Sequence, residues 1–151
     1  MAVNVEDIKK LREETGAGIA DCRSALEEAD GDMAKAKEVL KKRGLDKAGS
    51  KSDREVSAGV VETYSHGGRV GVLVELLCET DFVAKTEDFK TLAHEIALQI
   101  ASMNPSNEEE LIAQEYVRDP SQKIGDLVKA AIAKLGENIK IGKFARIALG
   151  S

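Results

Sequence analysis

The sequence is poor in aromatic residues, in histidine and in cysteine. Aromatic residues make up 3% of the 151 residues, and there is no tryptophan. A hydrophobic core must therefore be built from valine, isoleucine, leucine and alanine. The two histidines, His66 and His94, lie near no serine or cysteine in a recognisable nucleophile motif. Covalent catalysis is therefore not expected, and we assign no catalytic residue.

The motifs that hold metals and nucleotides are also missing. Cys22 and Cys78 form no CxxC or Cys/His spacing, so we expect small buried thiols in a reducing compartment and no metal site. No glycine-rich phosphate loop of the G-x-x-x-x-G-K-[ST] or G-x-G-x-x-G type follows a strand pattern. We therefore predict that the protein carries no nucleotide or other cofactor of its own.

Long apolar runs and an excess of positive charge are absent as well. No run approaches the roughly 20 apolar residues of a membrane span, and the N-terminus has no apolar signal region. The formal net charge is −5, which disfavours nucleic acid as a direct partner because phosphates require a basic face. We expect a cytoplasmic protein that binds neither membranes nor nucleic acid.

What the sequence does contain begins with three short helical patterns separated by glycine turns. Apolar residues at helical spacing predict helices over 5–15, 19–29 and 33–44, with Val5, Leu11 and Ile19 on inward faces. Asn4 is a suitable N-cap for the first helix, and Gly44 is expected to end the third. Residues 1–45 are therefore predicted to form a small three-helix domain.

A polar stretch separates this domain from the remainder of the chain. Residues 46–54 contain glycine and serine and show no periodicity, so we predict a flexible linker that proteases cut first. Residues 55–151 then form the second predicted domain.

The second domain mixes strand and helix patterns. Alternating or branched apolar residues predict strands over 55–65 and 69–78, joined by a glycine turn, and further strands over 139–141 and 144–149. Amphipathic helices are predicted over 86–103 and 124–135, with a short helix opened by Ser106 and a turn at Asp119 between them. The predicted fold class is α+β: a three-helix domain followed by an antiparallel sheet packed with helices.

An acidic residue beside a rare aromatic, Asp81-Phe82, stands between the second strand and the long helix. Phe82 precedes Phe89 by seven residues, so in one continuous helix both rings would be buried on the same face. Spacing alone favours that interpretation. The alternative is that Asp81 and Phe82 are presented to a partner.

Two resemblances bear on this choice. The first 45 residues, with Thr15-Gly16-Ala17-Gly18 in the first loop, resemble a ubiquitin-associated (UBA) domain. The segments from Leu11 to Leu26, from Cys78 to Lys85, and Gly136-Glu137-Asn138-Ile139 resemble, in this order, motifs of the elongation factor Ts family. This chain is similar to the short form of the family, which has a single core half.

The resemblance implies a guanine-nucleotide exchange factor for elongation factor Tu, a GTPase, and no enzyme activity. It assigns Asp81 and Phe82 to a wedge inserted near the magnesium site of the GTPase, which favours their exposure. It also implies flanking contacts and weaker candidates in the first domain, namely Thr80, Val83, Leu11, Arg12, Gly16, Ala17 and Gly18.

Two other functions remain open on the residues alone. One is a UBA-type adaptor without exchange activity, and the other is a small hydrolase that uses a carboxylate pair. We also predict a homodimer formed through the C-terminal half, near 139–149, because a late strand at a sheet edge readily pairs with a second copy.

Overall fold

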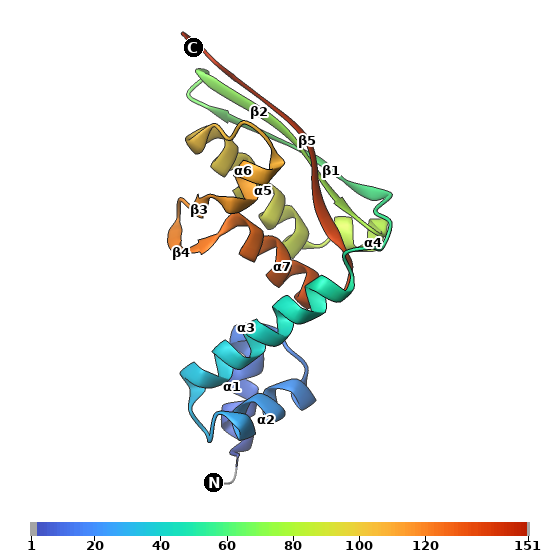
Figure 1. Ribbon diagram of the computed structural model, residues 1–151, viewed down its shortest axis with the longest axis vertical. Coiled ribbons are helices and arrows are strands. Elements are labelled where there is room, and N and C mark those ends of the chain that lie inside the picture. Colours follow the sequence, from blue (N-terminus) through green and yellow to red (C-terminus); the bar gives the residue numbers. More distant parts are fainter. Residues whose placement is uncertain (1–2, 151) are drawn as a thin grey trace.

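The computed structural model describes residues 3–150, and for 45–50 it describes the backbone without the side chains. Three helices at the N-terminal end, α1 (Val5–Thr15), α2 (Ile19–Glu28) and α3 (Met33–Ser50), precede a three-stranded sheet with helices. The two parts lie at opposite ends of an elongated molecule, with α3 leading from one to the other (Figure 1). The predicted α+β class is confirmed.

Helix α3 continues past the predicted end at Gly44. It runs to Ser50, so 46–50 is helical and the predicted linker is shortened to the turns that follow. Glycine inside a helix usually costs about 1 kcal/mol. Here a side chain at Gly44 would lie 3.1 Å from the Cβ of Ala133, so glycine allows α3 to approach α7 (Ile124–Leu135) closely. The side chains of 45–50 lie outside the described residues.

The sheet is antiparallel in the order β1-β2-β5. Its strands are β1 (Ala58–His66), β2 (Val70–Cys78) and β5 (Ile139–Ala148), with β5 at an edge as predicted. The two late strands predicted separately form one strand, and its register shifts opposite Glu75. Branched residues with alternating burial explain why β2 occupies the centre of the sheet.

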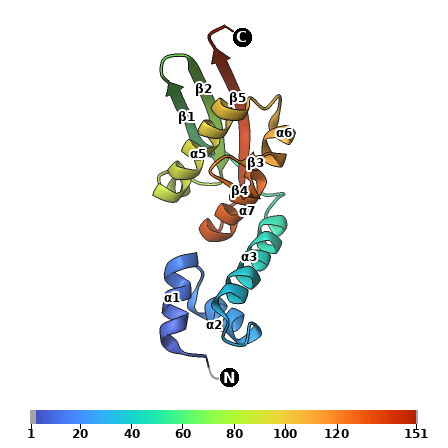
Figure 2. The same ribbon diagram turned by 90° about the vertical axis from the view of Figure 1, so that its left-hand side faces the viewer.

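Helices cover one face of the sheet (Figure 2). They are α5 (Glu87–Met103), α6 (Glu108–Ala113) and α7, with the one-turn helix α4 (Asp81–Ala84) at the end of β2. Phe89, Ile96 and Ile100 of α5 are fully buried against the inner side chains of β2. A separate core around Leu11 and Leu26 holds the three N-terminal helices together.

The segment between α6 and α7 differs from the prediction. Asn107, rather than Ser106, caps α6, because its side chain accepts the amide of Glu110. The predicted turn at Asp119 is part of a small hairpin, β3 (Glu115–Tyr116) with β4 (Asp119–Lys123). None of the helices that the structure describes combines the length and the apolar composition of a membrane span.

Candidate functional site

The site predicted at Asp81-Phe82 is a one-turn helix that projects from the end of β2. Thr80 caps α4, its hydroxyl accepting the amide of Val83, and Thr86 caps α5 by accepting the amide of Phe89. The second cap starts a new helix, so α4 and α5 do not share one hydrophobic stripe. The continuous helix that would bury Phe82 does not form.

Phe82 is consequently the most exposed large apolar side chain that the structure describes. Its exposed fraction is 88%, whereas Phe89 is fully buried. Asp81 is exposed beside it, and the buried residues Val83 and Ala84 fix the turn to the core. Val83, predicted as a flanking contact, therefore packs inward. The result is a short, well-anchored turn that presents a carboxylate and a phenyl ring to solvent, and we call Asp81 and Phe82 the tip.

A cluster of hydrogen bonds lies directly behind the tip. Glu137 accepts the amides of Glu79 and Thr80 at 3.1 and 3.0 Å through Oε1, and the Thr80 hydroxyl at 2.7 Å through Oε2. In return, Glu79 Oε2 accepts the amide of Asn138 at 2.7 Å. In each of the two segments, 79–80 and 137–138, a glutamate side chain therefore accepts a hydrogen bond from the backbone of the other. The sequence resemblance included Glu137 and Asn138, but spacing gave no signal of this contact.

The thiol that precedes this cluster is buried. Cys78 donates its Sγ hydrogen to the carbonyl of Thr80 at 3.1 Å. Burial, followed by the negative charge of Glu137, raises the pKa of the Cys78 thiol. Cys78 is thus a structural thiol that helps to hold the start of the turn. Cys22 is likewise free and buried, within the N-terminal core.

The candidates in the N-terminal helices separate into three settings. Leu11 is fully buried in the core of the three helices, so its side chain is not available to a partner. Arg12 is exposed and lines an open groove between α1 and α2. Val5 and Ile19 also line this groove and are mostly exposed, contrary to the predicted inward faces. The helical spacing placed them at the margin of the apolar stripe, where burial cannot be inferred.

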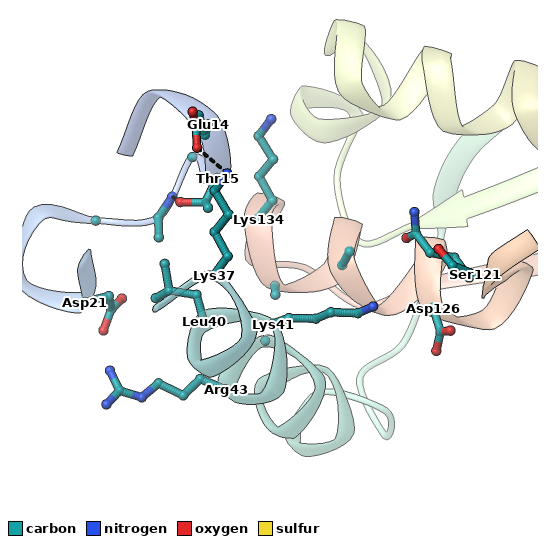
Figure 3. Close-up of a pocket in the computed structure, with 17 residues that line it drawn as sticks. Glu14, Thr15, Asp21, Lys37, Leu40, Lys41, Arg43, Ser121, Asp126 and Lys134 are labelled. Atoms are coloured by element: carbon teal, nitrogen blue, oxygen red, sulfur yellow. Dashed lines mark hydrogen bonds and ion pairs between the residues drawn. The ribbon is translucent and has the colours of Figure 1, made fainter. Parts of the chain in front are cut away.

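Gly16, Ala17 and Gly18 face the second part of the molecule. They line a cavity of about 660 Å³ between the N-terminal helices and α7. Figure 3 shows Lys37 and Lys41 of α3 on one side of this cavity and Lys134 of α7 on another. A Cβ at Gly16, whose φ is +73°, would lie 2.9 Å from the Cε of Lys134. The loop is therefore packed toward α7.

Charges around the cavity are largely paired within the chain. Lys37 contacts Glu14 at 2.5 Å, and Lys134 contacts Asp88 at 3.3 Å. The hydrogen bond from Lys37 lowers the pKa of the Glu14 carboxyl. Among the described residues, no group of three histidine, cysteine or acidic side chains could hold a metal ion.

Comparisons with known proteins show which family this chain resembles. The family model "Elongation factor TS" matches residues 79–151, from the start of the turn that carries the tip. Proteins named Elongation factor Ts from Herpetosiphon aurantiacus and Petrotoga mobilis are 41% and 43% identical to this chain. The first alignment covers 100% of both chains, and the second 99% of this chain and 100% of the relative.

Each of these alignments is longer than the chain itself. They extend over 197 and 196 positions against 151 residues, so they include positions that this chain lacks. The identity nevertheless extends over essentially the whole sequence. The fold and these alignments place the protein in the class of elongation factors. Within it, the chain belongs to the elongation factor Ts family.

Proposed function

We propose that this protein is a guanine-nucleotide exchange factor for elongation factor Tu. The observation that carries the proposal is the tip, where Phe82 is 88% exposed on a turn anchored to the core. An exposed phenylalanine normally gains free energy when it is buried, so it favours insertion into a partner. A turn fixed by two threonine caps and by Glu137 inserts without much loss of conformational entropy.

The mechanism is a displacement rather than a chemical reaction. Mg²⁺ neutralises the phosphates of a bound nucleotide, so moving its ligands weakens nucleotide binding. In the proposed complex, Phe82 wedges into the GTPase near that magnesium site and Asp81 makes a polar contact beside it. Thermodynamic reciprocity then requires a fresh nucleotide to weaken the binding of the exchange factor, which releases it. The protein is thus not an enzyme, because it makes and breaks no covalent bond.

The groove between α1 and α2 is the proposed second contact with the GTPase. Val5, Ile8 and Ile19 supply apolar surface and Arg12 supplies positive charge at this groove, whereas Arg23 is paired with Glu27 at 3.2 Å. This combination suits a helix with apolar and acidic residues on one face. Arg12 and the loop residues 16–18 remain candidate contacts, since Arg12, Gly16 and Gly18 are exposed, whereas the buried Leu11 supports the core.

We further propose that the protein acts in the cytoplasm as a homodimer, without contacting nucleic acid directly. The uncovered face of the sheet carries exposed apolar side chains from all three strands, including Val61, Leu73 and Ile147. Strand β5 lies at the sheet edge, and an edge or an apolar sheet face is a suitable surface for an isologous contact. The net charge of −5 disfavours an RNA contact.

The direct test measures release of labelled GDP from purified elongation factor Tu with and without the full chain. The proposal expects GDP release to accelerate with increasing protein, and to saturate. A UBA-type adaptor would bind the GTPase without changing the release rate. A hydrolase would turn over a substrate with a bell-shaped pH profile, and either of those outcomes would replace the proposal.

A further inference from the structure

The two chain segments behind the tip form a reciprocal contact. Strand β5 begins with Ile139 opposite Cys78, the last residue of β2, so 137–138 and 79–80 lie side by side just beyond the sheet. Glu137 accepts both amides of 79–80, and Glu79 accepts the amide of Asn138. The hydrogen bonding between β2 and β5 thus continues beyond the sheet toward the tip, with side-chain carboxylates as acceptors in place of backbone carbonyls.

Glu137 is aimed at this position by the end of α7. Gly136 ends the helix with a φ of +78°, a conformation that favours glycine, and its amide closes the helix on Ile132. The chain therefore reverses between α7 and β5, and Glu137 occupies the reversal. Its carboxylate then contacts Thr80, the N-cap of α4, at 2.7 Å.

The third segment at this junction is the connection from α3. The side chain of Asn138 is buried, with 2% exposure, and donates to the carbonyls of Arg54 at 2.7 Å and Ser52 at 3.3 Å. Arg54 also lies 3.7 Å from Glu79. One cluster thus holds the connection between the two parts of the chain and the base of the tip.

We infer that Glu137 is a positioning residue for the tip: it fixes the Thr80 cap, and through it the direction in which Asp81 and Phe82 project. The inference rests on the proposed exchange function. Three hydrogen bonds to a carboxylate, two of them from consecutive amides, define the orientation of the first turn of α4. Glu137 need not touch the GTPase, because its effect is transmitted through Thr80.

The first measurement does not involve the GTPase. Hydrogen–deuterium exchange at the amides of Glu79 and Thr80 is compared in the wild-type protein, Glu137→Ala and Glu137→Gln. We expect Glu137→Ala to speed exchange at both amides at least about tenfold, while the buried amides of α5 stay protected. Glu137→Gln keeps one acceptor oxygen and is expected to retain most of the protection. Unchanged protection in Glu137→Ala would overturn the inference.

The second measurement follows GDP release from elongation factor Tu at increasing concentrations of each variant. Glu137→Ala is expected to lower the maximal release rate about fivefold or more, with partial rescue by Glu137→Gln. Glu109→Ala removes an equivalent charge from the exposed first turn of α6 and serves as the matched control. The control should match the wild-type protein.

A double mutant separates positioning from general weakening of the fold. If Glu137 acts through the tip, Glu137→Ala should change the rate by less than about twofold once Phe82→Ala is present. An equal loss in both backgrounds would assign Glu137 a purely structural role. If the wild-type protein fails to accelerate release, the exchange function is wrong. Normal acceleration by Glu137→Ala would instead remove only this inference.

Discussion

Phe82 and Phe89 are separated by seven residues, yet the first ring is 88% exposed and the second is fully buried. The cap at Thr86 produces this difference by starting a new helix between them. Two phenylalanine rings in one short segment therefore differ completely in burial. Phe89 fills the core beneath the sheet, whereas Phe82 is exposed to solvent.

Phe82→Ala should separate stability from exchange. Because the ring is exposed, the free energy of unfolding should change by no more than about 0.5 kcal/mol. The maximal rate of GDP release should fall tenfold or more, which corresponds to at least about 1.4 kcal/mol at the transition state. Asp81→Ala should have a milder effect, since it removes a polar contact only. Denaturant midpoints and GDP-release rates on both variants test this.

Phe89→Ala is the matched control for that experiment. Truncating a fully buried phenylalanine should cost about 3–5 kcal/mol of stability. Loss of exchange by Phe89→Ala should therefore accompany unfolding. A folded Phe82→Ala protein that exchanges at the wild-type rate would remove the wedge from the mechanism.

The sequence was sufficient for elements with long, regular patterns. The branched run of β2 and the apolar stripe of α5 were predicted with nearly their observed bounds. The spacing argument nevertheless misplaced Phe82, because a helical period was extended across Thr86. A threonine followed by Glu87 and Asp88 is a local start signal for a helix, so the break was encoded in the sequence.

Other features depend on contacts that a single sequence does not reveal. The β3–β4 hairpin is held by the buried side chain of Gln99, which bonds to the carbonyl of Glu115 and the amide of Val117. Helix α3 passes Gly44 because α7 packs against it. Gln99 is far in sequence from the hairpin, and α7 is far in sequence from α3. Patterns of neighbouring residues therefore could not predict the hairpin or the extension of the helix.

The hairpin offers a test by alkaline titration. Burial, together with a hydrogen bond to Glu95, raises the pKa of Tyr116 to about 12. A group whose pKa is raised on folding stabilises the protein below its unfolded pKa. That contribution is therefore lost as pH rises from about 10 toward 12. Ultraviolet absorbance should show a late tyrosinate transition that Tyr116→Phe abolishes. A transition near the ordinary value would contradict the 2.6 Å contact with Glu95.

The connection after α3 is predicted to be the first site of limited proteolysis. Trypsin should cut at Lys51 or Arg54 before any site in α5, leaving a resistant fragment that starts near Glu55. Asn138→Ala removes the two hydrogen bonds to this segment and should accelerate the cut. Asn138→Asp should behave similarly, because a carboxylate cannot donate. Initial cleavage inside α5 would show that the connection is not the weakest segment.

The proposed homodimer predicts a mass that depends on the uncovered sheet face. Light scattering at micromolar concentration should give the mass of two chains. Ile147→Lys places a charge at a side chain that is 78% exposed, so the variant should stay folded and become monomeric. Lys143→Ala, near the strand bulge, serves as a control for changes within β5. A wild-type mass of one chain across a concentration series would reject the dimer.

Leu11 and Ile19 give a matched pair for the N-terminal groove. Leu11 is fully buried, so Leu11→Ala should destabilise the three helices by about 2–5 kcal/mol. Ile19 is 58% exposed, so Ile19→Ala should leave the unfolding transition nearly unchanged. If the groove binds the GTPase, Ile19→Ala should raise the protein concentration needed for half-maximal GDP release while the maximal rate stays near the wild-type value. Phe82→Ala should lower that maximal rate instead, because the proposed role of the groove is in binding and that of the tip is in displacement. An Ile19→Ala protein with unchanged half-saturation would show that the groove lies outside the interface.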